Sequence, residues 1–79
     1  MAITVKEFLK TKEFSDMVEQ IKSYNPGFMF KLPYYKMGKG QRIACAIVTK
    51  YCIKKNIITS MSFDMTLEGE VTEEVFKRL

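Results

Sequence analysis

The residues from 57 to 67 limit the possible folds more than any other stretch, because their side chains alternate in character. One set of alternate positions carries Ile57, Thr59, Met61, Phe63, Met65 and Leu67, and the other carries Ile58, Ser60, Ser62, Asp64 and Thr66. A period of two is typical of a β-strand with one face in the core and the other in water. We therefore expect a strand over 57–67 whose core face includes Phe63.

Two helices are predicted before this strand, near the N-terminus. Thr4 and Glu7 form the Thr-x-x-Glu pattern of a capping box at the start of the first helix. The apolar residues of 5–9 and those of 14–24 would lie on nearly opposite sides of one continuous helix, so we expect a break within 10–12. The second helix should end at Asn25-Pro26-Gly27, because a residue that precedes proline disfavours the helical conformation.

A third helix is predicted over 41–55, where apolar residues share one half of the helical wheel: Ile43, Ala44, Ile47, Val48, Tyr51 and Cys52. The stretch 28–32 predicts a short strand closed by Pro33, with a plain apolar loop as the alternative. After a turn at 68–70, we expect Thr72 to cap a short final helix that buries Val75, Phe76 and Leu79.

These elements predict a small α+β domain of the order α-α-β-α-β-α, in which a short two-stranded sheet packs against helices. A length of 79 residues favours one domain that spans 1–79. The two strands can be parallel, with the helix as a crossover, or antiparallel, with the helix laid across them. Two strands alone make a marginal sheet, so strand 57–67 should find another partner. One candidate is the same strand of a second chain, which predicts a homo-oligomer.

The residue composition argues against an enzyme. The chain has no histidine, which excludes Ser-His and Cys-His nucleophile pairs and leaves a zinc site short of ligands. Cys45 and Cys52 lie seven positions apart in one predicted helix. That spacing separates their Cα atoms by about 10 Å, too far for a disulfide. We expect a non-enzymatic protein without metal or other cofactor, in which both thiols are small buried side chains.

The formal charge of +4 is concentrated in the middle of the chain. Residues 28–56 contain seven basic residues and no acidic residue, whereas residues 57–79 contain two basic and five acidic residues. Aromatic side chains lie among the basic ones, a combination typical of surfaces that bind phosphates and stack on nucleobases. A lysine-rich surface that is only solvated is the alternative interpretation.

The stretch YYKMGKGQR, residues 34–42, places three cations at the start of the predicted helix 41–55, where the helix dipole disfavours positive charge. A bound anion would reverse that effect, because free backbone N–H groups and the cations would all point toward it. The stretch matches neither a P-loop nor a dinucleotide-binding motif, so a simple helix start stays open as the alternative. The candidate nucleic-acid or anion-binding residues are Tyr34, Tyr35, Lys36, Lys39, Arg42, Lys50 and Lys54.

Two hypotheses for the function follow. The leading one is a small basic binding protein that contacts the phosphates of DNA or RNA through segment 31–55. The alternative is a protein–protein interaction module (a small adaptor, inhibitor or subunit) that acts through an apolar surface or a strand edge, to which six methionines would be suited. The first ten residues are too charged for a signal peptide, and no apolar run approaches about 18 residues. We therefore expect a complete cytoplasmic polypeptide with no membrane partner.

Overall fold

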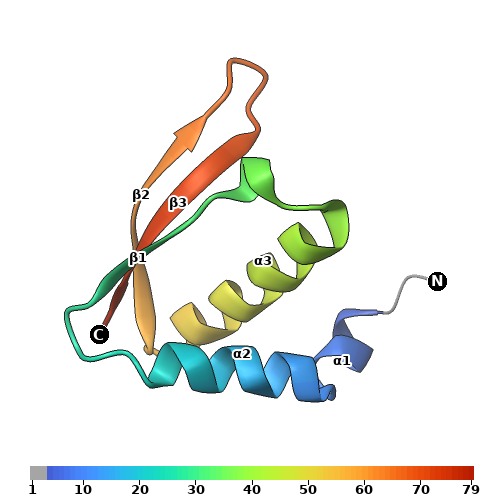
Figure 1. The fold of residues 1–79 in the computed structure, drawn as a ribbon, viewed down its shortest axis with the longest axis vertical. Helices are drawn as coiled ribbons and strands as arrows, with labels where there is room; N and C mark the ends of the chain where they lie inside the picture. Colours follow the sequence, from blue (N-terminus) through green and yellow to red (C-terminus); the bar gives the residue numbers. More distant parts are fainter. Residues whose placement is uncertain (1–3) are drawn as a thin grey trace.

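Three helices and a three-stranded antiparallel sheet make up the part of the chain that the computed structural model describes, residues 4–79. Figure 1 shows the elements, which run in the order α1 (Val5–Phe8), α2 (Lys12–Lys22), β1 (Met29–Leu32), the 3₁₀ turn η1 (Tyr34–Lys36), α3 (Lys39–Lys54), β2 (Ile58–Met65) and β3 (Val71–Arg78). The fold is the small α+β domain that the sequence predicts. Within 4–79 it has one strand more and one α-helix fewer than expected.

The predicted final helix is wrong, because this segment forms the central strand of the sheet. The strand order is β1-β3-β2, and β3 pairs antiparallel with both neighbours. Phe76 lies opposite Phe30 of β1 on one side and opposite Ser60 of β2 on the other. The additional partner expected for β2 therefore lies in the same chain. A second copy is not required to complete the sheet, and self-association stays a prediction.

The residues of β3 suit a strand once both of its edges are paired. Val71, Thr72 and Val75 are β-branched, which favours extended backbone. Glu73 and Glu74 favour a helix, but such propensities amount to only about 0.7 kcal/mol per residue or less, which pairing on both sides outweighs. In a segment of eight residues, the spacing of a few apolar side chains does not distinguish a helix from a strand.

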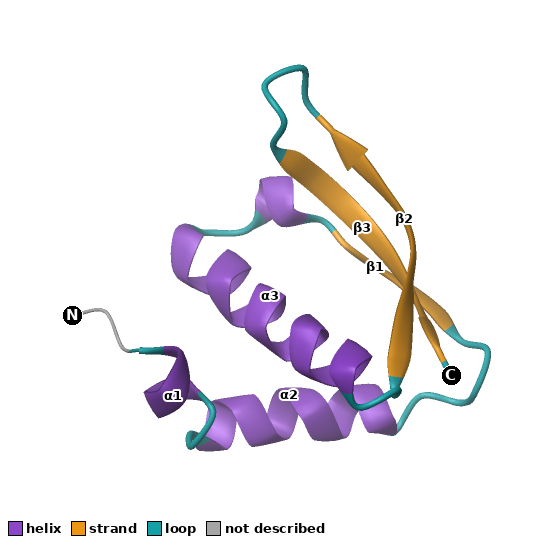
Figure 2. Ribbon diagram, turned by 180° about the vertical axis from the view of Figure 1, so that it is seen from behind, coloured by secondary structure: helices purple, strands orange, loops and turns teal. Residues whose placement is uncertain are grey.

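The predicted facing of β2 is also wrong. Ile58 is the buried residue of this strand, with 1% of its surface exposed, whereas Phe63 is 56% exposed. A β-bulge between Ser60 and Ser62 shifts the register, so the residues before and after it do not keep a single alternation. In addition, the β2–β3 hairpin extends beyond the helices (Figures 1 and 2), so its far half has no helix to pack against.

The core lies between one face of the sheet and the helices α2 and α3, which cover that face (Figure 2). Aromatic contacts join neighbouring elements within each layer: Phe14 of α2 packs edge-to-face against Tyr51 of α3 at 5.1 Å between ring centroids, and Phe30 of β1 stacks on Phe76 of β3 at 5.5 Å. The two helices contribute residues at spacings of three and four, as amphipathic helices do. The buried cluster contains Phe8, Phe14, Val18, Ile21, Ala44, Val48, Cys52, Ile58 and Phe76.

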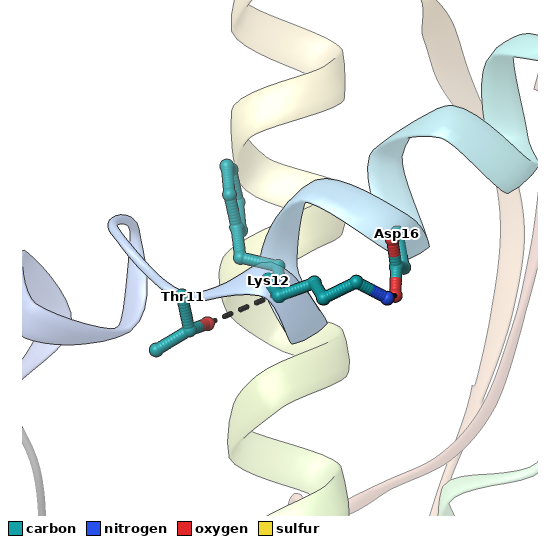
Figure 3. Close-up of polar contacts among 4 residues, drawn as sticks. Thr11, Lys12 and Asp16 are labelled. Atoms are coloured by element: carbon teal, nitrogen blue, oxygen red, sulfur yellow. Dashed lines mark hydrogen bonds and ion pairs between the residues drawn. The ribbon is translucent and has the colours of Figure 1, made fainter.

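The chain breaks between α1 and α2 where the sequence predicts it, and Thr11 is the residue that organises the break. The backbone N–H of Phe14 donates a hydrogen bond to Thr11 Oγ1 at 3.2 Å, which caps the start of α2 (Figure 3). The same hydroxyl donates to the carbonyl oxygen of Phe8 at 2.7 Å. The exposed Lys12, directly after Thr11, forms an ion pair with Asp16, one turn further along α2, at 3.1 Å (Figure 3).

Arg78, at the end of β3, joins three segments of the chain. Its Nη1 donates to the carbonyl oxygen of Ile57 at 3.3 Å and to that of Leu79 at 2.8 Å, and its Nη2 donates to the carbonyl oxygen of Lys22 at 3.4 Å. The last contact places a cation at the C-terminal end of α2, where the helix dipole favours positive charge. The C-terminal residues thus hold the end of α2 beside the start of β2.

The burial of Phe76 and the exposure of Phe63 predict opposite outcomes for the same substitution. Phe76→Ala should lower the free energy of unfolding by about 3–5 kcal/mol, because it leaves a cavity in the core. Phe63→Ala should lower it by no more than about 1 kcal/mol, because that ring is half exposed. Urea unfolding followed by circular dichroism measures both. Equal losses would contradict this placement of the core, and Phe76→Leu should give a smaller loss in the same direction if Phe76→Ala does not fold.

The cap of α2 is tested by Thr11→Ala, which should lower the free energy of unfolding by about 1 kcal/mol because the Phe14 N–H loses its acceptor. Lys12→Gln, one residue away, is the matched control. It removes only an exposed ion pair and should change the free energy by no more than about 0.5 kcal/mol. Denaturation of both variants under identical conditions measures the difference, and a Lys12→Gln effect as large as that of Thr11→Ala contradicts this role of the cap.

Candidate interaction groove

A groove opens between α3 and the face of the sheet that the helices cover. α3 lies close to the sheet at its C-terminal end and farther from it toward its N-terminal end (Figures 1 and 2). The volume of the groove is about 450 Å³, and its walls come from η1, α3 and β3. The residues that line the groove are Tyr34, Arg42, Ala46, Thr49, Lys50, Ile53, Val71, Glu74 and Phe76.

The groove combines an apolar surface with a few polar groups. Phe76 and Thr49 are almost completely buried, whereas Ile53 and Val71 are about 40% and 39% exposed. The Thr49 hydroxyl already donates to the carbonyl oxygen of Cys45 at 2.9 Å, so it has no need of a ligand. Binding sites in proteins typically have this character: mainly apolar walls with a small number of placed polar groups, in volumes of about 300–1,000 Å³.

A polar network holds one end of the groove in shape. Glu74 accepts hydrogen bonds from the Ser60 hydroxyl at 2.7 Å and from the Tyr34 hydroxyl at 3.5 Å. Arg42 Nε donates to the carbonyl oxygen of Tyr34 at 2.8 Å. Burial and the neighbouring Glu74 carboxylate raise the pKa of Tyr34 to about 12, so its hydroxyl stays protonated at neutral pH. The network connects η1 and α3 with β2 and β3, and the groove is therefore preformed.

The outer side of α3 carries a stripe of exposed residues, which we call the α3 stripe. Its members lie on the side of the helix opposite Ala44, Val48 and Cys52. Within residues 4–79, none of its four cations takes part in an ion pair. The α3 stripe consists of Lys39, Arg42, Ile43, Ala46, Lys50, Ile53 and Lys54.

The structure brings four of the seven candidate site residues together on the α3 stripe: Lys39, Arg42, Lys50 and Lys54. Tyr34, in η1, is half-buried with its hydroxyl directed to Glu74, so its ring is not free to stack on a base. Tyr35 is 54% exposed, and Lys36 Nζ lies 5.6 Å from the centroid of its ring. Arg42 both lines the groove and holds the backbone of η1, so it has a structural role that the sequence does not reveal.

The sequence pattern does not identify several of the groove residues. Val71, Glu74 and Phe76 form the sheet wall, whereas the sequence predicts a helix that begins after Thr72 and includes Glu74 and Phe76. The sequence places Ile43 on the apolar half of the helix with Ala44 and Val48, but Ile43 is 52% exposed and lies on the α3 stripe. Its position three residues before Ala46 and ten before Ile53 was the available signal for an apolar stripe among the cations.

The β2–β3 hairpin adds exposed apolar side chains near the groove. Phe63 pairs opposite Glu74, so it lies on the same face of the sheet as the groove. Met61, Met65 and the tip residue Leu67 are 48%, 51% and 105% exposed. Clusters of exposed apolar residues of this kind are typical of protein interaction surfaces.

Other kinds of site have less support. Cys45 and Cys52 are buried and unpaired, and burial raises the pKa of both thiols, which makes them weak nucleophiles. Within residues 4–79, no three His, Cys, Asp or Glu residues lie close enough together to hold a metal ion. None of the helices in this same part of the chain has the length and apolar character needed to cross a membrane.

Comparison of the chain with protein-family models, with curated proteins and with solved structures found no significant match. The proposal for the function therefore rests on the chemistry of the groove and of the α3 stripe.

The raised pKa of Tyr34 predicts a loss of stability at high pH. The folded state keeps the phenol proton up to a pH of about 12, whereas the unfolded chain releases it near 10. The stabilisation is therefore complete below pH 10 and is lost as the pH rises from 10 to 12. The free energy of unfolding should fall more steeply over this range in the wild type than in Tyr34→Phe. Urea titrations at several pH values measure both slopes, and identical slopes contradict the prediction.

Proposed function

We propose that this protein is a small non-enzymatic binding protein that takes a protein partner in the groove between α3 and β3. The observation that carries the proposal is the groove itself: a preformed hollow of about 450 Å³ with an apolar lining, next to exposed apolar side chains on α3 and on the hairpin. A protein partner supplies apolar side chains that fill such a hollow and polar groups that match its rim.

A nucleic acid is the second candidate, and one observation favours it: the α3 stripe carries four cations and no acid. Other features support a protein partner instead. Ile43, Ala46 and Ile53 alternate with the cations, and apolar aliphatic side chains give phosphates nothing to bind. Of the two tyrosines proposed to stack on bases, only Tyr35 is exposed.

The same proposal includes the absence of catalytic activity. General acid–base catalysis at neutral pH uses a group with a pKa near 7, most often histidine, and the chain contains none. Tyr34 is the groove residue whose pKa is clearly shifted, and the shift moves it away from neutrality. The groove can therefore bind a partner, but it lacks the side chains that usually catalyse a reaction.

The proposal is tested by photo-crosslinking from inside the groove. We place p-benzoylphenylalanine at Ala46, which is exposed and lines the groove, and irradiate the protein in a native lysate. A discrete adduct should form that protease removes and nuclease does not. The same label at Met29, an exposed residue on the opposite face of the sheet, is the matched control and should give no such adduct.

A second variant decides whether the adduct depends on the groove. Ile53→Glu introduces a charge into the apolar lining and should abolish crosslinking from position 46, while the folded state is verified by circular dichroism. A nuclease-sensitive adduct would make the nucleic-acid candidate the leading one. The absence of any adduct that depends on Ile53 would contradict both hypotheses for the groove, the protein partner and the nucleic acid.

A further inference from the structure

We infer that the segment which occupies the groove is an acidic amphipathic helix of the partner protein. This inference rests on the proposed function and adds the chemistry and the conformation of the occupant. Three independent features support it: the charge of the α3 stripe, the hydrogen bonding of the backbone in the groove walls, and the length and shape of the stripe.

The charges of the α3 stripe call for an acidic occupant. Lys39, Lys50 and Lys54 have no acidic partner in the described part of the chain, and Arg42 donates its Nε–H to a backbone carbonyl. The one carboxylate among the groove residues, Glu74, already accepts hydrogen bonds from two hydroxyl groups. A partner with aspartate or glutamate along its rim would therefore meet unneutralised cations, and a basic partner would be repelled.

The backbone of the groove walls calls for an occupant that satisfies its own hydrogen bonds. The α3 wall is a helix, whose N–H and C=O groups bond within the helix. The β3 wall is paired with β2 along its length and with β1 over 74–77. These walls therefore present mainly side chains, and a strand laid between them would leave its own polar backbone groups unpaired. A helix satisfies these groups internally. An extended peptide would fit the free edge of β2 instead.

The dimensions suit a helix as well. The sixteen residues of α3 give the stripe a length of about 24 Å, enough to accompany a helix of about four turns. Ala46 is the small residue at the middle of the stripe, between the larger Ile43 and Ile53, and a small side chain lets another helix approach closely. The occupant would present apolar residues at positions i, i+3 or i+4 and i+7 to the groove, with acidic residues on both sides of them.

An unbiased peptide selection tests this inference. A display library of random peptides is selected on the full-length protein, and the enriched sequences are examined for their spacing and charge. We expect apolar residues with helical spacing, flanked by an excess of Asp and Glu, and helix formation on binding by circular dichroism. Enriched peptides with alternate apolar residues, with basic flanks, or with undiminished binding to Ile53→Glu would overturn the inference.

Matched charge variants show whether the α3 stripe is the site. The triple change Lys39→Gln, Lys50→Gln and Lys54→Gln should weaken an enriched acidic peptide by about tenfold, measured by fluorescence anisotropy. The triple change Lys6→Gln, Lys10→Gln and Lys12→Gln alters the net charge equally, away from the groove, and should have an effect of less than about twofold. Equal effects would overturn the inference, and so would a labelled oligonucleotide that binds at physiological salt through the same three lysines.

The two proposals fail separately. A selection that yields no acidic helical peptide, together with a protease-sensitive adduct from position 46, would overturn the acidic helix and leave the protein partner standing. A nuclease-sensitive adduct from that position would remove both.

Discussion

The central position of β3 is the constraint on which the rest of the structure depends. β1 and β2 both pair with β3 and not with each other, so the sheet cannot form until the C-terminal segment is in place. Phe76 on this strand is 1% exposed and stacks on Phe30, and Arg78 binds carbonyl oxygens at the end of α2 and at the start of β2. The last residues of the chain therefore close the core and fix the positions of the helices. Contacts between residues far apart in the sequence slow folding, because the chain loses conformational entropy when the long loop closes, before the contacts stabilise it.

The same arrangement explains why part of the sheet is left without a cover. α2 and α3 pack where Ile58 and Phe76 are buried, and the hairpin continues past them (Figure 2). A chain of 79 residues buries a limited fraction of its apolar surface, and here Phe63, Met61 and Met65 remain about half exposed. A closer approach of α3 to the sheet would fill the groove and add dispersion contacts. The Glu74 network keeps polar groups at that position instead, and the groove stays open.

What the sequence predicts correctly is local, and what it does not predict depends on distant pairing. The cap at Thr4, the break before α2 and the turn at 68–70 follow from residues within a few positions of one another, and α3 begins and ends within two residues of the expected limits. The sequence predicts a helix for most of β3 because these eight residues are compatible with either a helix or a strand, and only their pairing with β1 and β2 makes them a strand. The facing of β2 depends on a bulge that no local pattern reveals. Of the candidate site, the charge pattern identifies the cations, whereas the sheet wall remains hidden by the wrong assignment of β3.

The distribution of charge gives a further reason to expect an acidic partner in the groove. The chain has nine acidic residues, and several of them neutralise cations away from α3, as Glu73 does for Lys31 on the outer face of the sheet at 3.1 Å. None does so on the α3 stripe, although Lys39 and Arg42 lie in the first turn of α3, where the helix dipole disfavours them. Lys50 and Lys54 are like charges at a spacing of four, which destabilises a helix by about 0.2–0.5 kcal/mol. An acidic helix in the groove would relieve both effects at once, so the features that slightly weaken α3 alone are those that would strengthen the complex.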